Sequence, residues 1–293
     1  MPNGQIIKAI SGFYYVQTKA GEVIQCRARG IFKFKKKQKS LLVGDWVQFD
    51  VTGLNEGVIT FVQPRQTELL RPPIANVDQA VVVCSLVQPD FSPMPLDRLL
   101  VQTEHAGLET VICLTKRDLI HDLSIIDEIK EIYGHAGYMM IITSIETGEG
   151  VEELREQLRG HTTVFAGQSG VGKSSLLNVL IPELQLETGR VSHRLGRGRH
   201  TTRQVELLSL PAGGQVADTP GFSQLQFQFP IDELVYAFPE FLQYVKYCKY
   251  RGCTHTQEDG CELREAVSNG FIHQLRYQHY LQFAEEIHKQ RRY

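Results

Sequence analysis

Four stretches in the first 68 residues alternate hydrophobic with polar positions and are rich in β-branched and aromatic side chains. They are IIKAISGFYYVQ, GEVIQCRARGIF, GDWVQFDV and GVITFVQP, and Gly, Asn and Asp turns separate them. A period of two residues indicates strands that bury one face. Several short strands in so little sequence predict an all-β domain over residues 1–68, and its expected form is a small OB-fold barrel.

The pattern changes after RPP at 71–73, which is expected to be a linker. Apolar strand-like runs then alternate with segments of helical spacing. This alternation predicts an α/β domain over residues 69–229, with a mostly parallel sheet covered on both faces. The expected strands span 78–87, 109–116, 138–144 and 162–167, the expected helices span 95–107, 122–137, 151–160 and 173–181, and a hairpin pairs 205–210 with 214–219.

Beyond residue 229 the strand-like runs stop, and a mostly helical domain is predicted for 230–293. Its last segment, HQLRYQHYLQFAEEIHKQ, has four apolar side chains near helical spacing: Leu275, Tyr280, Phe283 and Ile287. These side chains are expected to face a core. His279, in the same segment, is expected to lie on the helix surface.

Composition narrows the class of protein. The chain has 293 residues, 42% of them hydrophobic and 22% charged, which is enough for two or three globular domains. Its apolar runs are too short to cross a bilayer, and the N-terminus has no signal-peptide pattern. A cytoplasmic monomer without a membrane partner is therefore expected.

The net charge of −2 hides strong local asymmetry. Residues 1–68 hold ten Lys or Arg against five Asp or Glu, and residues 186–203 hold five Arg against one Glu. Such patches attract nucleic-acid phosphates regardless of the total charge. The expected RNA contacts are Lys33, Lys35, Lys36, Lys37 and Lys39 in the loop KFKKKQK, with Arg27 and Arg29 before it. The alternative for such a Lys run is a solvated loop.

The segment GQSGVGKSS matches the phosphate-loop pattern G-x-x-x-x-G-K-[ST]. Its residues are Gly167, Gln168, Ser169, Gly170, Val171, Gly172, Lys173, Ser174 and Ser175. The segment follows an expected strand and opens an expected helix, which is the context that the motif requires. Backbone N–H groups and the helix N-terminus would hold the phosphates of a nucleotide, Lys173 would reach the β- and γ-phosphates, and Ser174 would coordinate Mg²⁺. A Gly-rich turn with an incidental Lys is the weaker alternative.

Two further segments fit a guanine nucleotide. DTPG at 218–221 would place Asp218 near the Mg²⁺ ion and the Gly221 N–H at the γ-phosphate. TKRD supplies Thr115, Lys116, Arg117 and Asp118.

The Asp118 carboxylate can accept hydrogen bonds from two N–H groups that guanine has and adenine lacks. The stem of Lys116 would lie over the base, and SIETG, beginning at Ser144, would supply a backbone contact. Thr115 stands where such loops more often have Asn. Alone, TKRD could equally be a solvated loop after a strand.

The motifs occur in an unusual order. A common GTPase has its phosphate loop first and its base-reading loops later, whereas here TKRD and SIETG precede GQSGVGKS, HTTR and DTPG. A nucleotide site depends on contacts in space, so a circular permutation of the chain can preserve it.

A cluster of cysteines predicts a metal site near the C-terminus. Cys248, Cys253, His255 and Cys261 offer three thiolates and one imidazole, a closed set of ligands for one structural Zn²⁺. Unpaired thiols in a loop are the alternative. The other cysteines, Cys26, Cys84 and Cys113, lie singly in strand-like segments and are expected to be buried.

Taken together, GQSGVGKSSLLN, GRGRHTTR, DTPGF and C-x₄-C-x-H-x₅-C resemble the RsgA family, the small-subunit-dependent ribosome biogenesis GTPases. The resemblance covers essentially the whole chain. It implies an OB-fold, a circularly permuted P-loop GTPase and a zinc domain. The implied activity is hydrolysis of GTP to GDP, stimulated by the small ribosomal subunit and its rRNA during late maturation.

Hydrolysis needs a group that orients water. Ras-like enzymes place Gln after the glycine of DxxG, but here that position is Phe222, which can neither donate nor accept a hydrogen bond. His200, beside the Mg²⁺-sensing candidates Thr201 and Thr202, is the expected replacement, acting with Lys173. The alternative is that His200 only contacts rRNA or solvent.

Phe222 also favours a second hypothesis for the whole protein. In it, the chain is an RNA-binding zinc protein whose nucleotide site is a passive occupancy sensor. A phosphotransferase is a third possibility, but no acceptor site is evident in the sequence.

Overall fold

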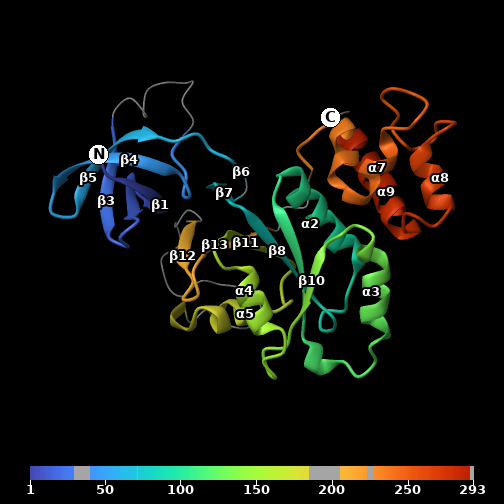
Figure 1. Cartoon of the computed structure of the whole chain (residues 1–293), viewed down its shortest axis with the longest axis horizontal. Helices are drawn as coiled ribbons and strands as arrows, with labels where there is room; N and C mark the ends of the chain where they lie inside the picture. The colour runs from blue at the N-terminus through green and yellow to red at the C-terminus, as the bar shows by residue number, and fades with distance from the viewer. Residues whose placement is uncertain (30–39, 71, 185–204, 223–226, 291–293) are drawn as a thin grey trace. The chain divides into compact units, whose positions relative to one another are not determined.

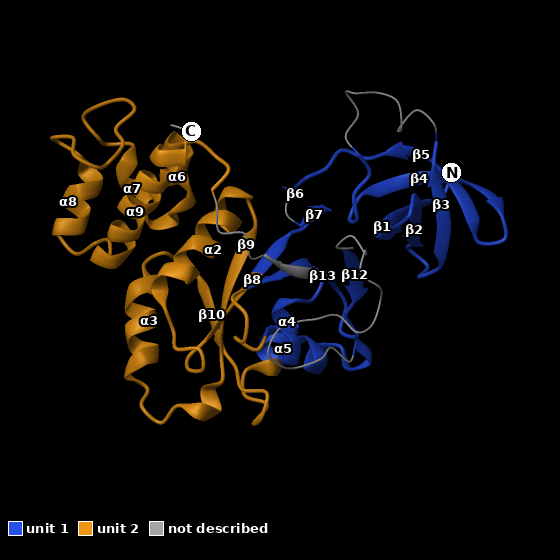
Figure 2. Ribbon diagram, turned by 180° about the vertical axis from the view of Figure 1, so that it is seen from behind, with its two compact units in different colours: residues 1–80, 152–166, 173–223 blue, residues 81–151, 167–172, 224–293 orange. Residues whose placement is uncertain are grey.

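The computed structural model describes residues 1–29, 40–70, 72–184, 205–222 and 227–290 (Figure 1). Contacts between Cα atoms divide the chain into two compact units, coloured separately in Figure 2. Unit 1 holds residues 1–80, 152–166 and 173–223, and unit 2 holds residues 81–151, 167–172 and 224–293. None of the helices in the described ranges is both long and apolar enough to span a membrane.

The N-terminal strands of unit 1 form the predicted barrel. They are β1 (Asn3–Ile10), β2 (Phe13–Thr18), β3 (Val23–Ala28), β4 (Trp46–Gly53) and β5 (Glu56–Val62). Their order is β1-β2-β3-β5-β4, and a β1–β4 pairing closes the barrel. β3 and β5 run parallel. This pairing, together with the strand order, is that of an OB-fold. Val16, Val47 and Ile59 are fully buried inside it because they occupy the inward positions of the two-residue period.

A buried joint connects the barrel to the following segment. We call the contact between residues 43–45 and 74–76 the Gly44 joint. The Ala75 N–H donates to the Val43 carbonyl at 2.9 Å, and the Asn76 side chain donates to the Gly44 carbonyl at 2.9 Å. A Cβ on Gly44 would lie 1.9 Å from the Ala75 carbonyl oxygen, so only glycine permits this approach.

The segment expected to be a linker therefore contributes to this joint. It forms a two-stranded sheet of β6 (Glu68–Leu70) and β7 (Pro73–Ala75). Beside it, the buried Asp45 carboxylate accepts two hydrogen bonds from the Arg65 guanidinium, at 2.7 and 2.8 Å. The Leu42 N–H also donates to Asp45, at 2.8 Å, so the polar groups of the joint are paired.

The rest of unit 1 continues the barrel into part of the α/β region. β11 (Thr162–Ala166) pairs in parallel with β13 (Gln215–Phe222), and β13 pairs in antiparallel fashion with β12 (Glu206–Ser209). The predicted hairpin is confirmed, and β12 in turn pairs with β1 of the barrel. The helices of this part are α4 (Val151–Gln157), α5 (Lys173–Leu180) and the 3₁₀ turn η2 (Pro182–Leu184).

Unit 2 contains the strands and helices around the base-reading loop. The neighbouring strands are β8 (Gln79–Ser85), which enters unit 2 at Val81, then β9 (Glu109–Thr115) and β10 (Met139–Ile142). The helices are α2 (Pro93–His105) and α3 (Ser124–Gly134), with the 3₁₀ turn η1 (Arg117–Leu119) after β9. Residues Val81 to Val83 of β8 are fully buried, as its continuous apolar run predicted.

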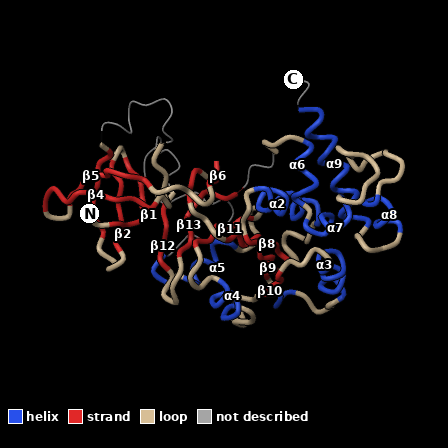
Figure 3. The backbone as a smooth tube through the Cα atoms, turned by 45° about the horizontal axis from the view of Figure 1, so that its top comes forward, coloured by secondary structure: helices blue, strands red, loops and turns tan. Residues whose placement is uncertain are grey.

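The C-terminal part of unit 2 is helical, as predicted (Figure 3). It comprises α6 (Ile231–Leu234), η3 (Val235–Ala237), η4 (Pro239–Phe241), α7 (Leu242–Val245), α8 (Glu262–Ser268) and α9 (Gln274–Gln290). Tyr280, Phe283 and Ile287 of α9 face one core together with Phe238 and Phe241.

Helix α9 also buries charge, which corrects one expectation. His279 is 5% exposed and contacts the carboxylate of Asp97 on α2, so it does not lie on the helix surface. The neighbouring Arg276 is fully buried and donates to Asp97 at 2.6 Å and to Glu240 at 2.6 Å. These four residues form a buried ionic cluster that joins α9 to α2.

A second contact between α2 and the C-terminal helices involves Arg98. Its guanidinium lies 4.9 Å from the ring centre of Phe227 and 4.8 Å from that of Phe283, and it donates to both carboxylate oxygens of Glu286. Nearby, the His105 ring stacks on Phe229 at 4.0 Å. The C-terminal helices and α2 thus share one packed interface within unit 2.

The buried ionic cluster gives a test of this interface. Asp97→Asn removes one carboxylate and leaves Arg276 buried with less compensation, so the free energy of unfolding should fall by about 3–5 kcal/mol. Urea unfolding at neutral pH measures the change. Glu152→Gln, which removes the exposed partner of Arg155, should cost about 0–1 kcal/mol. A loss for Asp97→Asn as small as that of the control would contradict the role of the cluster.

Candidate nucleotide site and metal centre

The base-reading segment lies at the end of β9, where the chain turns sharply. Lys116 adopts a left-handed backbone conformation with φ of 62° and caps the turn η1. The Ser144 hydroxyl donates to Oδ1 of Asp118 at 2.6 Å. Ser144 is 1% exposed, so its side chain is held firmly and orients the half-buried Asp118 carboxylate. The two segments predicted to contact the base are therefore brought together.

Thr115, which stands where such loops more often have Asn, links this loop to the phosphate loop. Its hydroxyl donates to the Val171 carbonyl of the phosphate loop at 2.6 Å. The side chain is 5% exposed, and a methyl on Gly172 would lie only 3.6 Å from its oxygen. The short hydroxyl thus bridges the end of β9 and the phosphate loop directly.

Lys116 makes a second connection between the two loops. Its ammonium donates to the Gly170 carbonyl at 2.9 Å and also contacts the Gln88 carbonyl, in the turn after β8. The Lys116 stem is therefore held between two backbone segments. Arg117, in contrast, donates from its guanidinium to the Ile120 carbonyl at 3.0 Å, within its own turn.

The phosphate loop has the backbone that its glycines predict. Gly167, Gly170 and Gly172 all have positive φ, of 149°, 83° and 97°. A Cβ on Gly167 would lie 2.3 Å from the Val83 carbonyl oxygen of β8, so a side chain at this position would force the loop away from the strand. Gln168, Ser169 and Gly170 are exposed, so a phosphate can approach this part of the loop.

The remaining phosphate-site residues lie in unit 1 and are described there. Lys173, Ser174 and Ser175 open helix α5 and are partly exposed. The register of β13 against β11 shifts between Val164 and Ala166, so that residues 218–221, the DTPG segment, form extra length in β13. The backbone of Asp218 to Phe222 is described, but their side chains, and His200, Thr201 and Thr202 entirely, lie outside the described residues.

Backbone N–H groups of the SIETG loop donate hydrogen bonds within the loop or to the residue that follows it. The Ser144 N–H donates to the Glu149 carbonyl at 3.0 Å, and the Thr147 N–H donates to the Ser144 hydroxyl at 3.2 Å. Among the residues that the structure describes, the Ile145 and Glu146 amides have no such partner. A backbone contact from this loop to a base would therefore come from Ile145 or Glu146 rather than from Ser144.

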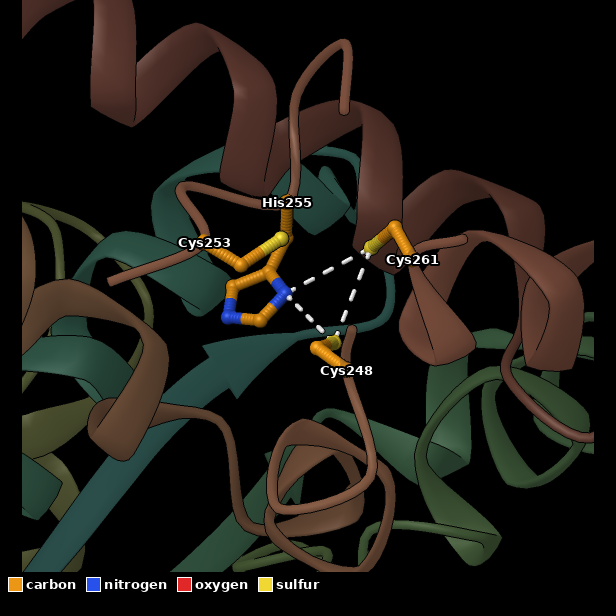
Figure 4. A group of neighbouring side chains, drawn as sticks. All are labelled: Cys248, Cys253, His255 and Cys261. Carbon is orange, nitrogen blue, oxygen red and sulfur yellow. Dashed lines mark hydrogen bonds between the residues drawn. The ribbon is translucent and has the colours of Figure 1, made fainter. Parts of the chain in front are cut away.

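The cysteine cluster is assembled as the sequence predicted (Figure 4). Nδ1 of His255 lies 3.4 Å from Sγ of Cys248 and 3.5 Å from Sγ of Cys261, and those two sulfurs are 4.0 Å apart. A tetrahedral site with metal–sulfur bonds of about 2.3 Å has S···S edges of about 3.8 Å and S···N edges of about 3.5 Å. With Cys253, the four ligand atoms lie within 4.8 Å of one another, so the cluster fits one metal ion.

The loop between the ligands is shaped by Glu258, which the sequence analysis did not single out. Its carboxylate accepts hydrogen bonds from the Thr254 N–H at 2.7 Å, the Thr254 hydroxyl at 2.6 Å and the Thr256 N–H at 3.0 Å. Burial alone would raise the pKa of Glu258, but these bonds outweigh it and lower the pKa to about 2. The carboxylate is therefore ionised at neutral pH, and its contribution to stability is lost only as the pH falls from about 4.5 to about 2.

Helix α9 holds the same loop from the other side. The Tyr277 hydroxyl donates to the His255 carbonyl at 2.8 Å, and the Tyr280 hydroxyl donates to the Thr254 carbonyl at 2.7 Å. His255 has a left-handed backbone conformation, with φ of 58°. Nothing in the sequence indicated that Tyr277 and Tyr280 hold this loop, because aromatic residues in an amphipathic helix are expected simply to face a core.

Glu258 provides a test of the metal centre. Glu258→Gln removes the charge that organises the loop and should weaken metal binding about 10–100-fold, the usual effect of losing a group that orients ligands. Competition with a coloured chelator at neutral pH measures the affinity. Asp259→Asn, an exposed neighbour, should leave it unchanged; equal affinities for the two variants would show that Glu258 has no such role.

Comparisons with known proteins show the family of the chain. The RsgA GTPase family model matches residues 62–228, and the RsgA N-terminal domain model matches residues 3–59. A Geobacillus thermodenitrificans protein named small ribosomal subunit biogenesis GTPase RsgA is 53% identical over 290 residues, covering 98% of both chains. A Bacillus cytotoxicus protein of the same name is 48% identical over 294 residues, covering 99% of both.

Two solved structures are similar over the whole chain. One, described as YloQ, a circularly permuted GTPase, is 43% identical with a TM-score of 0.83, covering 99% of this chain and 96% of that one. The other, YjeQ from Thermotoga maritima, is 36% identical with a TM-score of 0.86, covering 98% of both. With its base-reading loop ahead of its phosphate loop and a closed barrel before both, the chain belongs to the RsgA family of circularly permuted GTPases.

Proposed function

We propose that this GTPase binds the small ribosomal subunit and hydrolyses GTP in response to it during late subunit maturation. The nucleotide part rests on the hydrogen bond from the Thr115 hydroxyl to the Val171 carbonyl, which joins the base-reading loop to the phosphate loop. Within the base-reading region, the Ser144 hydroxyl also holds Asp118. The ribosomal part is supported by the name that relatives at 47–53% identity share. Such a protein would act in the cytoplasm, and we expect a monomer.

Guanine selectivity follows from the held carboxylate. The Ser144 hydroxyl occupies Oδ1 of Asp118 and fixes the plane of the group, so that the carboxylate faces the N1–H and the 2-amine of guanine. Adenine would present an unprotonated nitrogen there, which leaves the carboxylate unpaired. The Ile145 amide is the expected donor to the guanine oxygen, and the Lys116 stem covers one face of the base.

The phosphates would be bound by the loop Gly167–Gly172 and the start of α5. Lys173 would contact the β- and γ-phosphates, Ser174 and Asp218 would hold Mg²⁺, and the Gly221 N–H would meet the γ-phosphate. Mg²⁺, when bound with the nucleotide, neutralises charge on the phosphate oxygens.

The water-orienting group is expected to come from the HTTR segment, because Phe222 cannot supply one. We propose that His200 orients the attacking water and that Thr201 or Thr202 senses the metal. Intrinsic hydrolysis would then be slow, and contact of this segment with the ribosome would raise the rate.

RNA binding is proposed for the outer face of β2 and β3, the usual ligand face of an OB-fold. The Arg27 guanidinium lies 4.7 Å from the centre of the Phe13 ring, and Phe13 and Arg27 are opposite each other in the ladder. Arg27 and Arg29 are exposed there, so they can pair with phosphates while the ring offers a stacking surface. The lysines Lys33, Lys35, Lys36, Lys37 and Lys39 belong to the same proposal and lie outside the described residues.

The metal centre is proposed to hold one structural Zn²⁺. Three thiolates and an imidazole are the ligands that zinc prefers, and they fill its four positions. No chemistry is proposed for this ion, because a closed site has no position for a substrate.

A passive nucleotide sensor is the competing function. Phe222 at the water-orienting position favours it. In this case the protein would bind RNA and GTP but would not turn over faster on the ribosome.

Base selectivity can be tested at Asp118. Asp118→Asn should weaken GDP binding at least about a hundredfold, because an amide cannot accept both guanine N–H groups. The variant should prefer xanthosine diphosphate, whose 2-oxygen accepts a hydrogen bond from the new amide. Titration with both nucleotides measures this preference. Asp122→Asn, which makes the same change at an exposed residue just before α3, is the control. Unchanged GDP affinity in Asp118→Asn would refute the proposed base contact.

Hydrolysis should be measured with and without purified small ribosomal subunits, with ATP as the nucleotide control. The small subunits should strongly stimulate the hydrolysis of GTP but not that of ATP. His200→Ala should lose about a hundredfold of the stimulated rate or more, whereas His121→Ala, an exposed histidine elsewhere, should keep it. Subunit binding without stimulation would instead support the passive sensor.

A further inference from the structure

Strand β1 changes partner partway along its length. Residues Asn3 to Gln5 pair with β4 and close the barrel, whereas Lys8 pairs with Glu206 of β12. The register of β1 against β2 shifts between Ile6 and Lys8, which marks a bulge. Bulges turn a strand locally, so this one directs the second half of β1 away from the barrel and toward the hairpin β12–β13.

The pairing of Lys8 leads directly to a residue of the nucleotide site. Glu206 is opposite Lys8 on one side and opposite Asp218 on the other, so the three form one row across β1, β12 and β13. The Lys8 ammonium lies 2.6 Å from Oε2 of Glu206. Asp218 is the residue for which the Mg²⁺ contact is proposed.

Among the described residues, two connections between the barrel and the rest of unit 1 differ in how deeply they are buried. The Gly44 joint is buried, with Gly44 and Ala75 in close approach and Asp45 fully enclosed. Between β1 and β12, in contrast, the described ladder has a single residue pair, and its ionic side chains are 31% and 34% exposed. A barrel that pivots at the Gly44 joint would therefore form or break the Lys8–Glu206 contact at little cost.

We propose that the Lys8–Glu206 pair is a latch through which RNA bound to the barrel positions Asp218 for stimulated hydrolysis. The two residues are positioning residues, since neither belongs to the proposed nucleotide contacts. The inference rests on the proposed function, because it concerns how the RNA-bound barrel affects turnover.

The physical basis is that the Lys8–Glu206 contact can be closed or open, and that both the RNA-binding barrel and the nucleotide site at Asp218 affect which of these two states is favoured. RNA that binds the barrel favours one orientation of it about the Gly44 joint. When the latch is closed, β12 takes the matching position, and the backbone of Asp218 follows through the β12–β13 ladder. Reversing one charge replaces attraction by repulsion and opens the latch, whereas reversing both restores it.

The experiment compares Lys8→Glu, Glu206→Lys and the double variant in GTP hydrolysis with small ribosomal subunits. Each single variant should lower the stimulated rate about two- to fivefold, the range that an exposed ion pair can control. The double variant should recover most of that loss. Unstimulated hydrolysis and GDP affinity should stay unchanged in all three.

Two controls separate the latch from general charge effects. Lys19→Glu makes the same charge change on the barrel at an exposed turn and should affect subunit binding as much as Lys8→Glu does, without loss of turnover on the saturated complex. The pair Glu156→Lys and Arg159→Glu reverses an exposed ion pair elsewhere in unit 1 and should have no effect on turnover.

Hydrogen exchange supplies a second readout. Subunit binding should protect the amides of β12 and β13 in the native chain and in the double variant, but less in either single variant. This pattern tests the mechanical step without relying on turnover.

The outcomes distinguish a failure of the latch from a failure of the proposed function. A native chain that is stimulated, with single variants that are stimulated equally and protected equally, overturns the latch and leaves the proposed function intact. Single variants that lose stimulation without recovery in the double variant also overturn it. A native chain that the subunit does not stimulate overturns the proposed function and the latch with it.

Discussion

The hydrogen bond from the Thr115 hydroxyl to the Val171 carbonyl is the contact on which the nucleotide site depends. It ties the end of β9, where we propose that the base is read, to the loop that we propose holds the phosphates. Lys116 reinforces the connection through Gly170. Because both loops are fixed to each other before a nucleotide arrives, little conformational freedom is lost on binding. The site therefore needs no particular order of its segments along the chain, and the circular permutation leaves it intact.

The permutation changes which elements the site is attached to. The segment after DTPG continues into the C-terminal helices, and these helices pack on α2 through the buried ionic cluster and through Arg98, which lies over the adjoining rings of Phe227 and Phe283. At the other end, the barrel meets the hairpin that carries DTPG. The DTPG segment is therefore connected along the chain to the C-terminal helices and through the β12–β13 hairpin to the barrel.

The motifs and the apolar periodicity were sufficient to predict the barrel, most of the α/β elements, the C-terminal helices and the gathering of the Cys and His side chains. The nucleotide roles of the phosphate loop and the base loop stay predictions. Motifs and periodicity were insufficient wherever a polar residue is buried by tertiary contact. Arg276 and His279 look like surface positions because periodicity counts apolar side chains, and their carboxylate partners are distant in sequence. Glu258 and the Lys8–Glu206 register were missed for a related reason: loop hydrogen bonds and strand register depend on the assembled structure.

The long sequence separation between α2 and α9 has a consequence for synthesis. Arg276 is the buried partner of Asp97, which precedes it by 179 residues, and the tyrosines of the same helix fasten the metal-binding loop. A chain emerging from the ribosome therefore carries α2 without its partner Arg276 until α9 (Gln274–Gln290) has been made. The core of unit 2 can close only after this helix has emerged, whatever has folded before it.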